Sequence, residues 1–370
     1  MIRNLGFALV LSLPLSQFAG CSGDTGEEGF AGLAGLESKE GASSGTDRPY
    51  LQPGPGDRLT FPADFGPHPQ HRIEWWYLTA NLETEAGEPL GLQWTQFRQA
   101  LEPRAANAPA PASTSWPLQA AWMAHGAVSW KGQHYFAEKL ARGDIGHAGA
   151  TALPLQVWLD NWRLSGNADN SRWQLQANGE DWSYDLTLSI EGAPVAHGEE
   201  GFSAKSVSGE GSMYFSLVDI AISGEVRLDG EVLLVTGKGW FDREWSSQLL
   251  KTGQKGWDWF ALHLDGGDKL MVFRLRDDSG GFLSGTWLPA GGDPVPLRPE
   301  QLNLKELERD NDVPVRWLLR IPDYQVELQL NVPPGDYLNR GLYPYWESPV
   351  SVSGSHTGEG YMELTGYKLR

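Results

Sequence analysis

The chain has 370 residues, a net charge of −18 and a single cysteine. This length predicts two domains, and one cysteine excludes an intramolecular disulfide. The acidic charge argues against a nucleic-acid partner, because phosphates would be repelled by such a surface. The 17 tryptophans and 45 glycines favour twisted strands, tight turns and aromatic-lined cavities over helical bundles.

The N-terminal residues 1–20 are typical of a secretory signal peptide. Arg3 precedes an apolar run from Leu5 to Leu15, which is too short to span a membrane. The run leads to Phe18-Ala19-Gly20-Cys21, which resembles a bacterial lipobox and implies cleavage before Cys21 and lipid attachment to it. The alternative is an ordinary signal peptide with an incidental cysteine. Ser22 after the cysteine resembles the outer-membrane sorting preference, so a membrane partner through the lipid anchor is expected, at the periplasmic face of the outer membrane in a bacterial cell envelope.

Residues 21–57 are rich in glycine, serine and acidic residues and end in a Pro-Gly-Pro-Gly run. Such a composition cannot form a core, and we predict a disordered tether. The folded part is then expected to comprise a first domain over residues 58–246 and a second over residues 247–370.

The first domain shows short alternating segments that turn signals separate. After a proline-rich loop at 61–69, strands are expected at 72–82, 90–98 and 122–130, with a long surface loop at 103–117. Further strands are expected at 155–164, 171–177, 183–190, 213–219 and 225–235. This spacing predicts an antiparallel barrel or sandwich rather than βαβ units.

The second domain has the same character. Asp265-Gly266-Gly267-Asp268 between two aromatic and aliphatic runs predicts a hairpin. Strands are expected near 282–288, 313–321 and 324–332, and residues 301–309 are the one short helix candidate.

The stretch 239–246 is the strongest candidate for chemistry. If it is a strand, one face carries Trp240, Asp242 and Glu244, and the other carries Phe241, Arg243 and Trp245. The two acidic residues would lie about 6.5–7 Å apart at their Cα atoms. Mutual repulsion and aromatic walls would keep one carboxyl protonated near neutral pH, as a general acid requires. The alternative is a barrel rim where both carboxylates pair with Arg243 or with basic groups of neighbouring strands.

The histidines carry weaker signals. His68, His71 and Glu74 could form a metal site, but the surrounding prolines preclude a helix that would align the ligands, so no metal and no cofactor are expected. His125 lies in an expected strand of small, apolar residues. It could be either a buried structural histidine or a catalytic one.

Together these motifs resemble the lipocalin-like proteins grouped with AttH and with carotenoid 1,2-hydratase (hydroxyneurosporene synthase). The resemblance spans residues 60–368 and rests on segments throughout that range: Phe61-Pro62, Glu74-Trp75-Trp76-Tyr77, His125, the stretch 240–245, Tyr345-Trp346-Glu347 and Gly360–Tyr367. It implies an all-β fold of two lipocalin-like antiparallel β-barrel domains in tandem.

The resemblance also implies site residues. Asp242 would be the catalytic acid that protonates an isoprenoid double bond, with Glu244 handling the water and Trp240 facing the cation. Trp240 stands where the hydratases typically have tyrosine. The ligand-binding residues implied are Glu74, Trp75, Trp76, Tyr77, His125, Trp245, Tyr345, Trp346 and Glu347.

Two functions follow as hypotheses. The first is a hydratase acting on an apolar isoprenoid or lipid-like small molecule. The second is a non-enzymatic lipid or lipoprotein carrier that serves an ABC transporter. A secreted serine hydrolase is a minor alternative, because the chain has no Gly-x-Ser-x-Gly motif and an all-β fold lacks the strand-turn-helix elbow.

Overall fold

The computed structural model describes residues 50–103, 119–143, 146–248, 250–251 and 253–367. The predicted signal peptide, the lipidation site Cys21 and most of the predicted loop at 103–117 lie outside these residues. No helix in the described ranges is long and apolar enough to cross a membrane.

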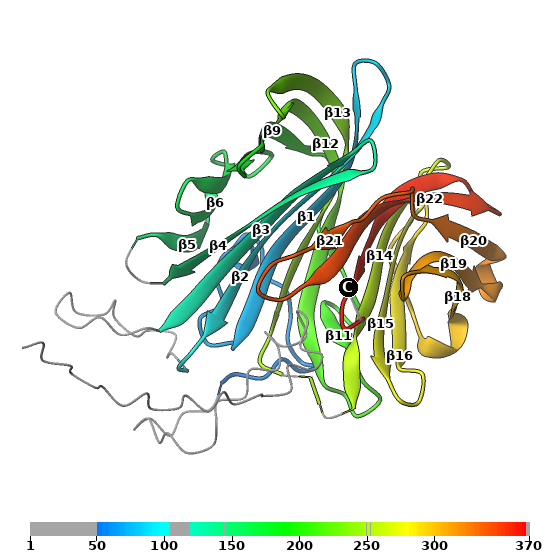
Figure 1. Cartoon of the computed structure of the whole chain (residues 1–370). Coiled ribbons are helices and arrows are strands. Elements are labelled where there is room, and N and C mark those ends of the chain that lie inside the picture. Colours follow the sequence, from blue (N-terminus) through cyan, green and yellow to red (C-terminus); the bar gives the residue numbers. More distant parts are fainter. Residues whose placement is uncertain (1–49, 104–118, 144–145, 249, 252, 368–370) are drawn as a thin grey trace, which may run out of the picture.

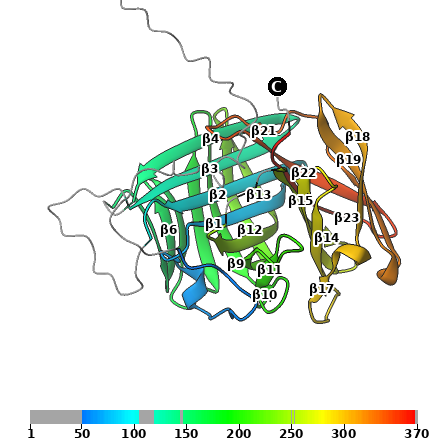
Figure 2. The ribbon, with the colours of Figure 1, turned by 90° about the horizontal axis from the view of Figure 1, so that it is seen from below.

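The first domain is a 13-stranded antiparallel sheet that curls into a near-barrel (Figure 1, Figure 2). Its main path runs β4-β3-β2-β1-β13-β12-β9-β8-β7-β6-β5, and β10 and β11 both pair with β12. The strands are β1 (Ile73–Thr84), β2 (Pro89–Ala100), β3 (Ala120–Trp130), β4 (Gln133–Arg142), β5 (Ala148–Ala152), β6 (Leu155–Leu159), β7 (Trp162–Gly166), β8 (Arg172–Asn178), β9 (Trp182–Ile190), β10 (Val195–Ala196), β11 (Phe202–Ala204), β12 (Gly211–Leu228) and β13 (Glu231–Ser246).

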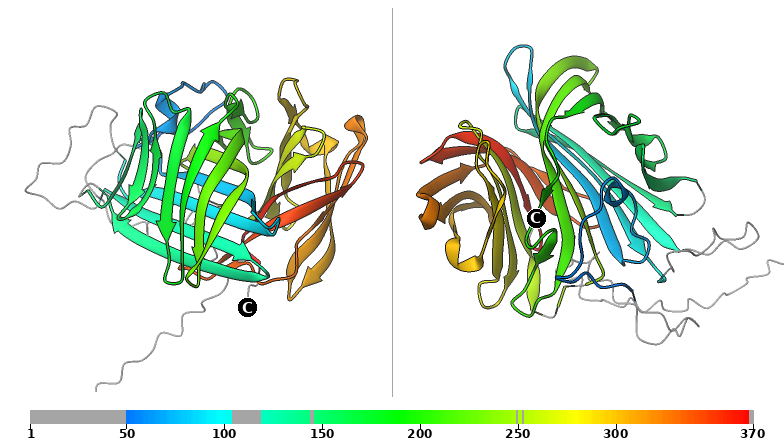
Figure 3. Two further views of the ribbon diagram at one scale, coloured as in Figure 1. Left: turned by 90° about the horizontal axis from the view of Figure 1, so that it is seen from above. Right: turned by 180° about the vertical axis from the view of Figure 1, so that it is seen from behind.

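The second domain is a 10-stranded antiparallel sheet curled into a half-barrel beside the first (Figure 3). Its order is β17-β16-β15-β14-β23-β22-β20-β19-β18, with β21 paired to β22. The strands are β14 (Gln254–Leu264), β15 (Lys269–Asp277), β16 (Phe282–Leu288), β17 (Val295–Leu297), β18 (Asn303–Asp310), β19 (Val313–Ile321), β20 (Val326–Asn331), β21 (Leu338–Asn339), β22 (Tyr345–Gly354) and β23 (Gly358–Leu364). Single-turn 3₁₀ helices cover Ala63–Phe65, Pro299–Gln301 and Pro322–Tyr324. The predicted all-β fold of two antiparallel, barrel-like domains in tandem is confirmed.

The hairpin β12–β13 positions the acidic stretch. Asp229 and Gly230 both adopt positive φ, 49° and 85°, as a two-residue turn between twisted strands requires. On one edge, β13 is paired with β12 over residues 231–245, and on the other edge it is paired with β1 over residues 235–246. Asp242 therefore lies in the middle of a sheet, where its backbone is held from both sides.

Some expectations differ from the structure. The expected strands at 155–164 and 225–235 are each interrupted by a turn, which separates β6 from β7 and β12 from β13. Residues 301–309 are not helical, since β18 occupies most of this range and pairs with β19; its helix-favouring residues are overridden by pairing at a solvent-exposed sheet edge. Residues 50–57, assigned to the tether, lie against the first domain: the Leu51 N–H donates to Gln70 O at 3.0 Å, and the Tyr50 hydroxyl donates to Ala100 O at 2.9 Å. Hydrogen bonds from its backbone and from the Tyr50 side chain hold this segment against the first domain despite its small apolar content.

Candidate functional site

The side chains of β13 alternate between two different environments. Phe241 and Trp245 belong to the core inside the near-barrel, and Arg243 is fully buried there. Trp240 packs in a separate cluster that includes Trp259 and Tyr361 of the second domain. The face that carries Asp242 and Glu244 is therefore turned toward the second domain.

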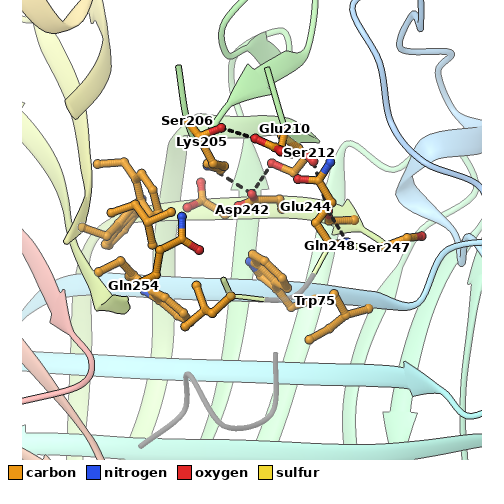
Figure 4. A pocket seen from close by; sticks show the side chains of 18 of the residues that line it. Trp75, Lys205, Ser206, Glu210, Ser212, Asp242, Glu244, Ser247, Gln248 and Gln254 are labelled. Carbon is orange, nitrogen blue, oxygen red and sulfur yellow. Dashed lines mark hydrogen bonds and ion pairs between the residues drawn. The ribbon is translucent and has the colours of Figure 1, made fainter. Parts of the chain in front are cut away.

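A cavity of about 330 Å³ lies on that face. Both domains contribute aromatic walls: Trp75, Tyr77 and Phe97 come from β1 and β2, and Trp257, Trp259 and Phe273 come from β14 and β15. Six charged groups also line it, namely Asp242, Glu244, Glu363, Glu210, Lys205 and Lys251. Figure 4 shows Asp242 and Glu244 above Trp75. A cavity with aromatic walls and convergent polar groups is typical of a small-molecule site.

Asp242 is 2% exposed and is held by three donors. Its Oδ1 accepts from the Trp240 Nε1–H at 2.7 Å and from the Ser216 hydroxyl at 2.5 Å, and its Oδ2 accepts from the Tyr214 hydroxyl at 2.7 Å. Burial raises the pKa of Asp242 to about 7, although these donors oppose the rise. An aspartic acid with such a pKa is divided between its protonated and ionised forms at neutral pH, which suits proton transfer.

Glu363 supplies a second carboxyl with a raised pKa from the opposite domain. It lies on β23 and accepts a hydrogen bond from the Trp257 Nε1–H at 2.6 Å. Burial, with smaller contributions from Asp242 and Glu244, raises its pKa to about 8. The sequence motif around residue 361 contained Glu363, but no site role was assigned to it, because nothing local indicates that β23 faces β13 across a cavity.

Glu244 is a third carboxylate that lines the cavity, together with Asp242 and Glu363. Its carboxylate accepts from the Ser212 hydroxyl and lies 3.2 Å from Lys205 Nζ. Lys205, just after β11, also stands 4.0 Å from the centroid of the Phe273 ring. Sequence reasoning missed Lys205, Ser212 and Tyr214, which reach the site only through the pairing of β11 with β12 and of β12 with β13.

Several residues that the resemblance assigned to ligand binding lie elsewhere. Glu74 is fully buried inside the near-barrel and pairs with Arg98 and Arg243. Trp76 packs in the same core, as does Trp245, which stacks on His68 at 3.7 Å between ring centroids. Arg243 thus pairs with Glu74 and points away from Asp242, so it does not form the rim pair considered above.

The others lie between the two sheets or in the second core. His125 is fully buried; its Nδ1 lies 2.9 Å from the Tyr345 hydroxyl and its Nε2 lies 2.9 Å from Glu138 Oε2. The Tyr77 hydroxyl donates to Glu347 Oε2 at 2.9 Å. Trp346 packs in the core of the second domain. Of the residues assigned to ligand binding, Trp75 and Tyr77 line the cavity.

Trp240, assigned to face a cation, supports Asp242 through its indole N–H and is not among the cavity-lining residues. The indoles that face the cavity are Trp75, Trp257 and Trp259. Within the described ranges, no group of three or more His, Cys, Asp or Glu residues is arranged to hold a metal ion.

Comparison with known proteins agrees with this architecture. A family model described as AttH-like matches residues 52–367. A crystal structure assigned as an AttH from Nitrosomonas europaea is 32% identical, with a TM-score of 0.75 over 86% of this chain and 99% of that one. Kievitone hydratase from Nectria haematococca is 16% identical, with a TM-score of 0.65 over 87% of this chain and 99% of that one. CghA bound to Sch210972 is 13% identical, with a TM-score of 0.54 over 86% of this chain and 96% of that one. The last two share the fold. No curated protein matches the chain.

Proposed function

The chain belongs to the AttH-like family, and we propose that it binds an apolar compound with an isoprenoid-type double bond between its two domains and adds water to that bond. One observation carries the proposal: a buried, protonatable aspartic acid, Asp242, lines an aromatic cavity. The structural likeness to kievitone hydratase is compatible with this chemistry but concerns the fold alone.

Asp242 starts the reaction as the acid. It transfers its proton to one carbon of the double bond, so that a C–H bond forms and the neighbouring carbon becomes a carbocation. Trp75, Trp257 and Trp259 line the cavity, and an indole face stabilises an adjacent cation by about 0.5–2 kcal/mol.

Glu244 completes the addition. Water bonds to the carbocation through its oxygen, and Glu244, which shares the cavity wall with Asp242, accepts the proton that this water loses. Glu244 then releases that proton to solvent and Asp242 takes one up. The sum is alkene plus water giving an alcohol, with both carboxyl groups restored.

The role of Asp242 is tested with Asp242→Asn. We expect the rate of ¹⁸O incorporation from labelled water into prenylated phenols and linear polyenes to fall by about 10²–10⁴-fold, measured by mass spectrometry. Ligand binding, followed by quenching of tryptophan fluorescence, should persist because the aromatic walls remain. Asp293→Asn, at an exposed position, is the matched control and should keep the full rate. A wild-type rate in the Asp242→Asn variant would refute the assignment.

A carrier is the second candidate, favoured by the nine aromatic and aliphatic residues in the cavity lining. In this case the protein holds its ligand and releases it unchanged, and an ABC transporter of the cell envelope is the proposed partner. Native mass spectrometry of the purified protein separates the two. A co-purifying apolar ligand that gains no oxygen in labelled water would favour the carrier.

The membrane anchor is a further part of the proposal and rests on the lipobox-like sequence at Cys21. We expect the wild-type protein to incorporate labelled fatty acid and to fractionate with the outer membrane, because several acyl chains anchor a protein stably. Cys21→Ser should lose the label and appear in the soluble fraction. Unchanged membrane fractionation without label would contradict lipidation.

A further inference from the structure

A buried row of hydrogen-bonded side chains leads from Asp242 into the second domain. Ser216 Oγ lies 2.5 Å from Asp242 Oδ1, His197 Nε2 lies 2.6 Å from Ser216 Oγ, and His197 Nδ1 lies 2.8 Å from Thr286 Oγ1. Ser216, His197 and Thr286 are 0%, 1% and 2% exposed, and none of them lines the cavity. His197 follows β10 and Thr286 lies on β16, so the row crosses from one domain to the other.

The other two donors to Asp242 have a fixed direction. An indole N–H can only donate, so Trp240 Nε1 always donates to Oδ1. The Tyr214 hydroxyl accepts from the Trp259 Nε1–H at 3.1 Å, and its own proton is directed to Asp242 Oδ2. Ser216 is different, because both of its partners can donate as well as accept.

The row can therefore run in either of two directions. When Asp242 is ionised, the Ser216 hydroxyl donates to Oδ1, His197 Nε2–H donates to Ser216, and Thr286 donates to His197 Nδ1. When Asp242 is protonated on Oδ1, it donates to Ser216, Ser216 donates to His197 Nε2, and His197 Nδ1–H donates to Thr286. The ring of His197 is neutral in both arrangements, but it changes tautomer.

From this geometry we infer that Thr286, His197 and Ser216 form a proton relay that reloads Asp242 from behind the cavity. When the Thr286 hydroxyl takes up a proton, its own proton passes to His197 Nδ1, the His197 Nε2 proton passes to Ser216, and the Ser216 proton passes to Asp242 Oδ1. One proton enters, one reaches the carboxylate, and the three hydrogen bonds reverse. The inference rests on the proposed role of Asp242 as proton donor, and it makes His197 a residue that acts through Asp242.

The surroundings of the row favour this neutral shuttle. Burial, aided by Lys205, lowers the pKa of His197 to about 3, so the ring does not become charged near neutral pH. The Tyr214 ring lies 4.1 Å from the His197 ring, centroid to centroid. The charged groups that influence Asp242 and its donors are Glu244 and Glu363, with Lys205 next to Glu244.

The test is the tautomer of His197 in the wild-type protein, and it needs no substrate. Ring-¹⁵N-labelled histidine is followed by NMR from pH 5.5 to 8.5, with the His197 signals assigned by their loss in His197→Gln. We expect the proton to move from Nδ1 at low pH to Nε2 at high pH, with a midpoint equal to that of the Asp242 carboxyl ¹³C titration. A histidine that only ties β10 to β16 would keep one tautomer. A constant tautomer while Asp242 titrates overturns the relay.

Two variants sharpen the result. In Ser216→Ala, Asp242 should still titrate, at a higher pH because the Ser216 hydroxyl that lowers its pKa is lost. The tautomer of His197 should be fixed, because the link is cut; a tautomer that still follows pH in this variant overturns the relay. Asp242→Asn should also fix the tautomer. The relay and the proposed function can fail independently. Tautomer exchange in a protein that hydrates no alkene would support the relay but not the proposed function. Asp242-dependent hydration with a constant His197 tautomer would support the proposed function and overturn the relay.

Discussion

Glu74→Gln is expected to lower the free energy of unfolding by about 3–5 kcal/mol, since removing one partner of a buried ion pair leaves an uncompensated charge. Glu74 is fully buried between Arg98 and Arg243. Burial opposes its ionisation, but the two guanidinium groups outweigh this and hold the pKa of Glu74 well below its usual range. Arg243 is also fully buried and would lose its counter-charge. Urea denaturation followed by tryptophan fluorescence measures the change.

The matched control is Glu85→Gln, at an exposed turn between β1 and β2. Surface substitutions of this kind usually change stability by less than about 0.5 kcal/mol. An equally small loss for Glu74→Gln would contradict the structural role of this ion-pair network inside the near-barrel.

Asp242→Asn is expected to alter the pH dependence of stability. The folded-state pKa of Asp242 is raised to about 7 from 3.8. A carboxyl whose pKa is raised by folding contributes stability that is fully present below the unfolded-state pKa and is lost as pH rises through the folded-state pKa. Relative to the variant, the wild-type protein should therefore lose stability between pH 4 and pH 7, by up to about 4 kcal/mol for a shift of about three pKa units.

The comparison must be made as a difference between the two proteins at each pH. Burial lowers the pKa values of His71, His134, His197 and His263, and these groups make the wild-type protein less stable as pH falls below about 6.5. Both proteins share that effect, so the difference isolates Asp242. Asp293→Asn should give a curve parallel to the wild type. Parallel curves for Asp242→Asn as well would show that Asp242 is not held in its protonated form.

The expected pH dependence of stability is related to the proposed function of Asp242. An aspartic acid kept out of water beside Glu244 and Glu363 destabilises the folded protein at neutral pH, and such a position persists where activity depends on it. If Asp242→Asn stabilises the protein at neutral pH and also abolishes water addition, then Asp242 both lowers the stability of the folded protein and is required for its activity.

The sequence by itself determined the strand character of the chain and the division of residues 240–245 between two faces. Aromatic and β-branched runs separated by Asp-Gly and Gly-Gly turns predict antiparallel strands, and the two-residue period places Asp242 with Glu244 and opposite Arg243. The same period separates Glu74 and Trp76 from Trp75 and Tyr77. The resemblance grouped all four as ligand-binding residues, whereas the first two face the near-barrel core and the last two line the cavity.

Only the tertiary structure decided where the candidate site lies. The period of a strand does not say which face meets another domain, so the facing of Asp242 by Glu363, 121 residues away in the chain, had no local signal. Ser216 and His197 likewise reach Asp242 through the pairing of β10, β12 and β13. Residues 303–310 show the same limit, because their local preference for helix yields to pairing with β19. Local spacing sets which side chains share a face, and long-range pairing and packing set what that face touches.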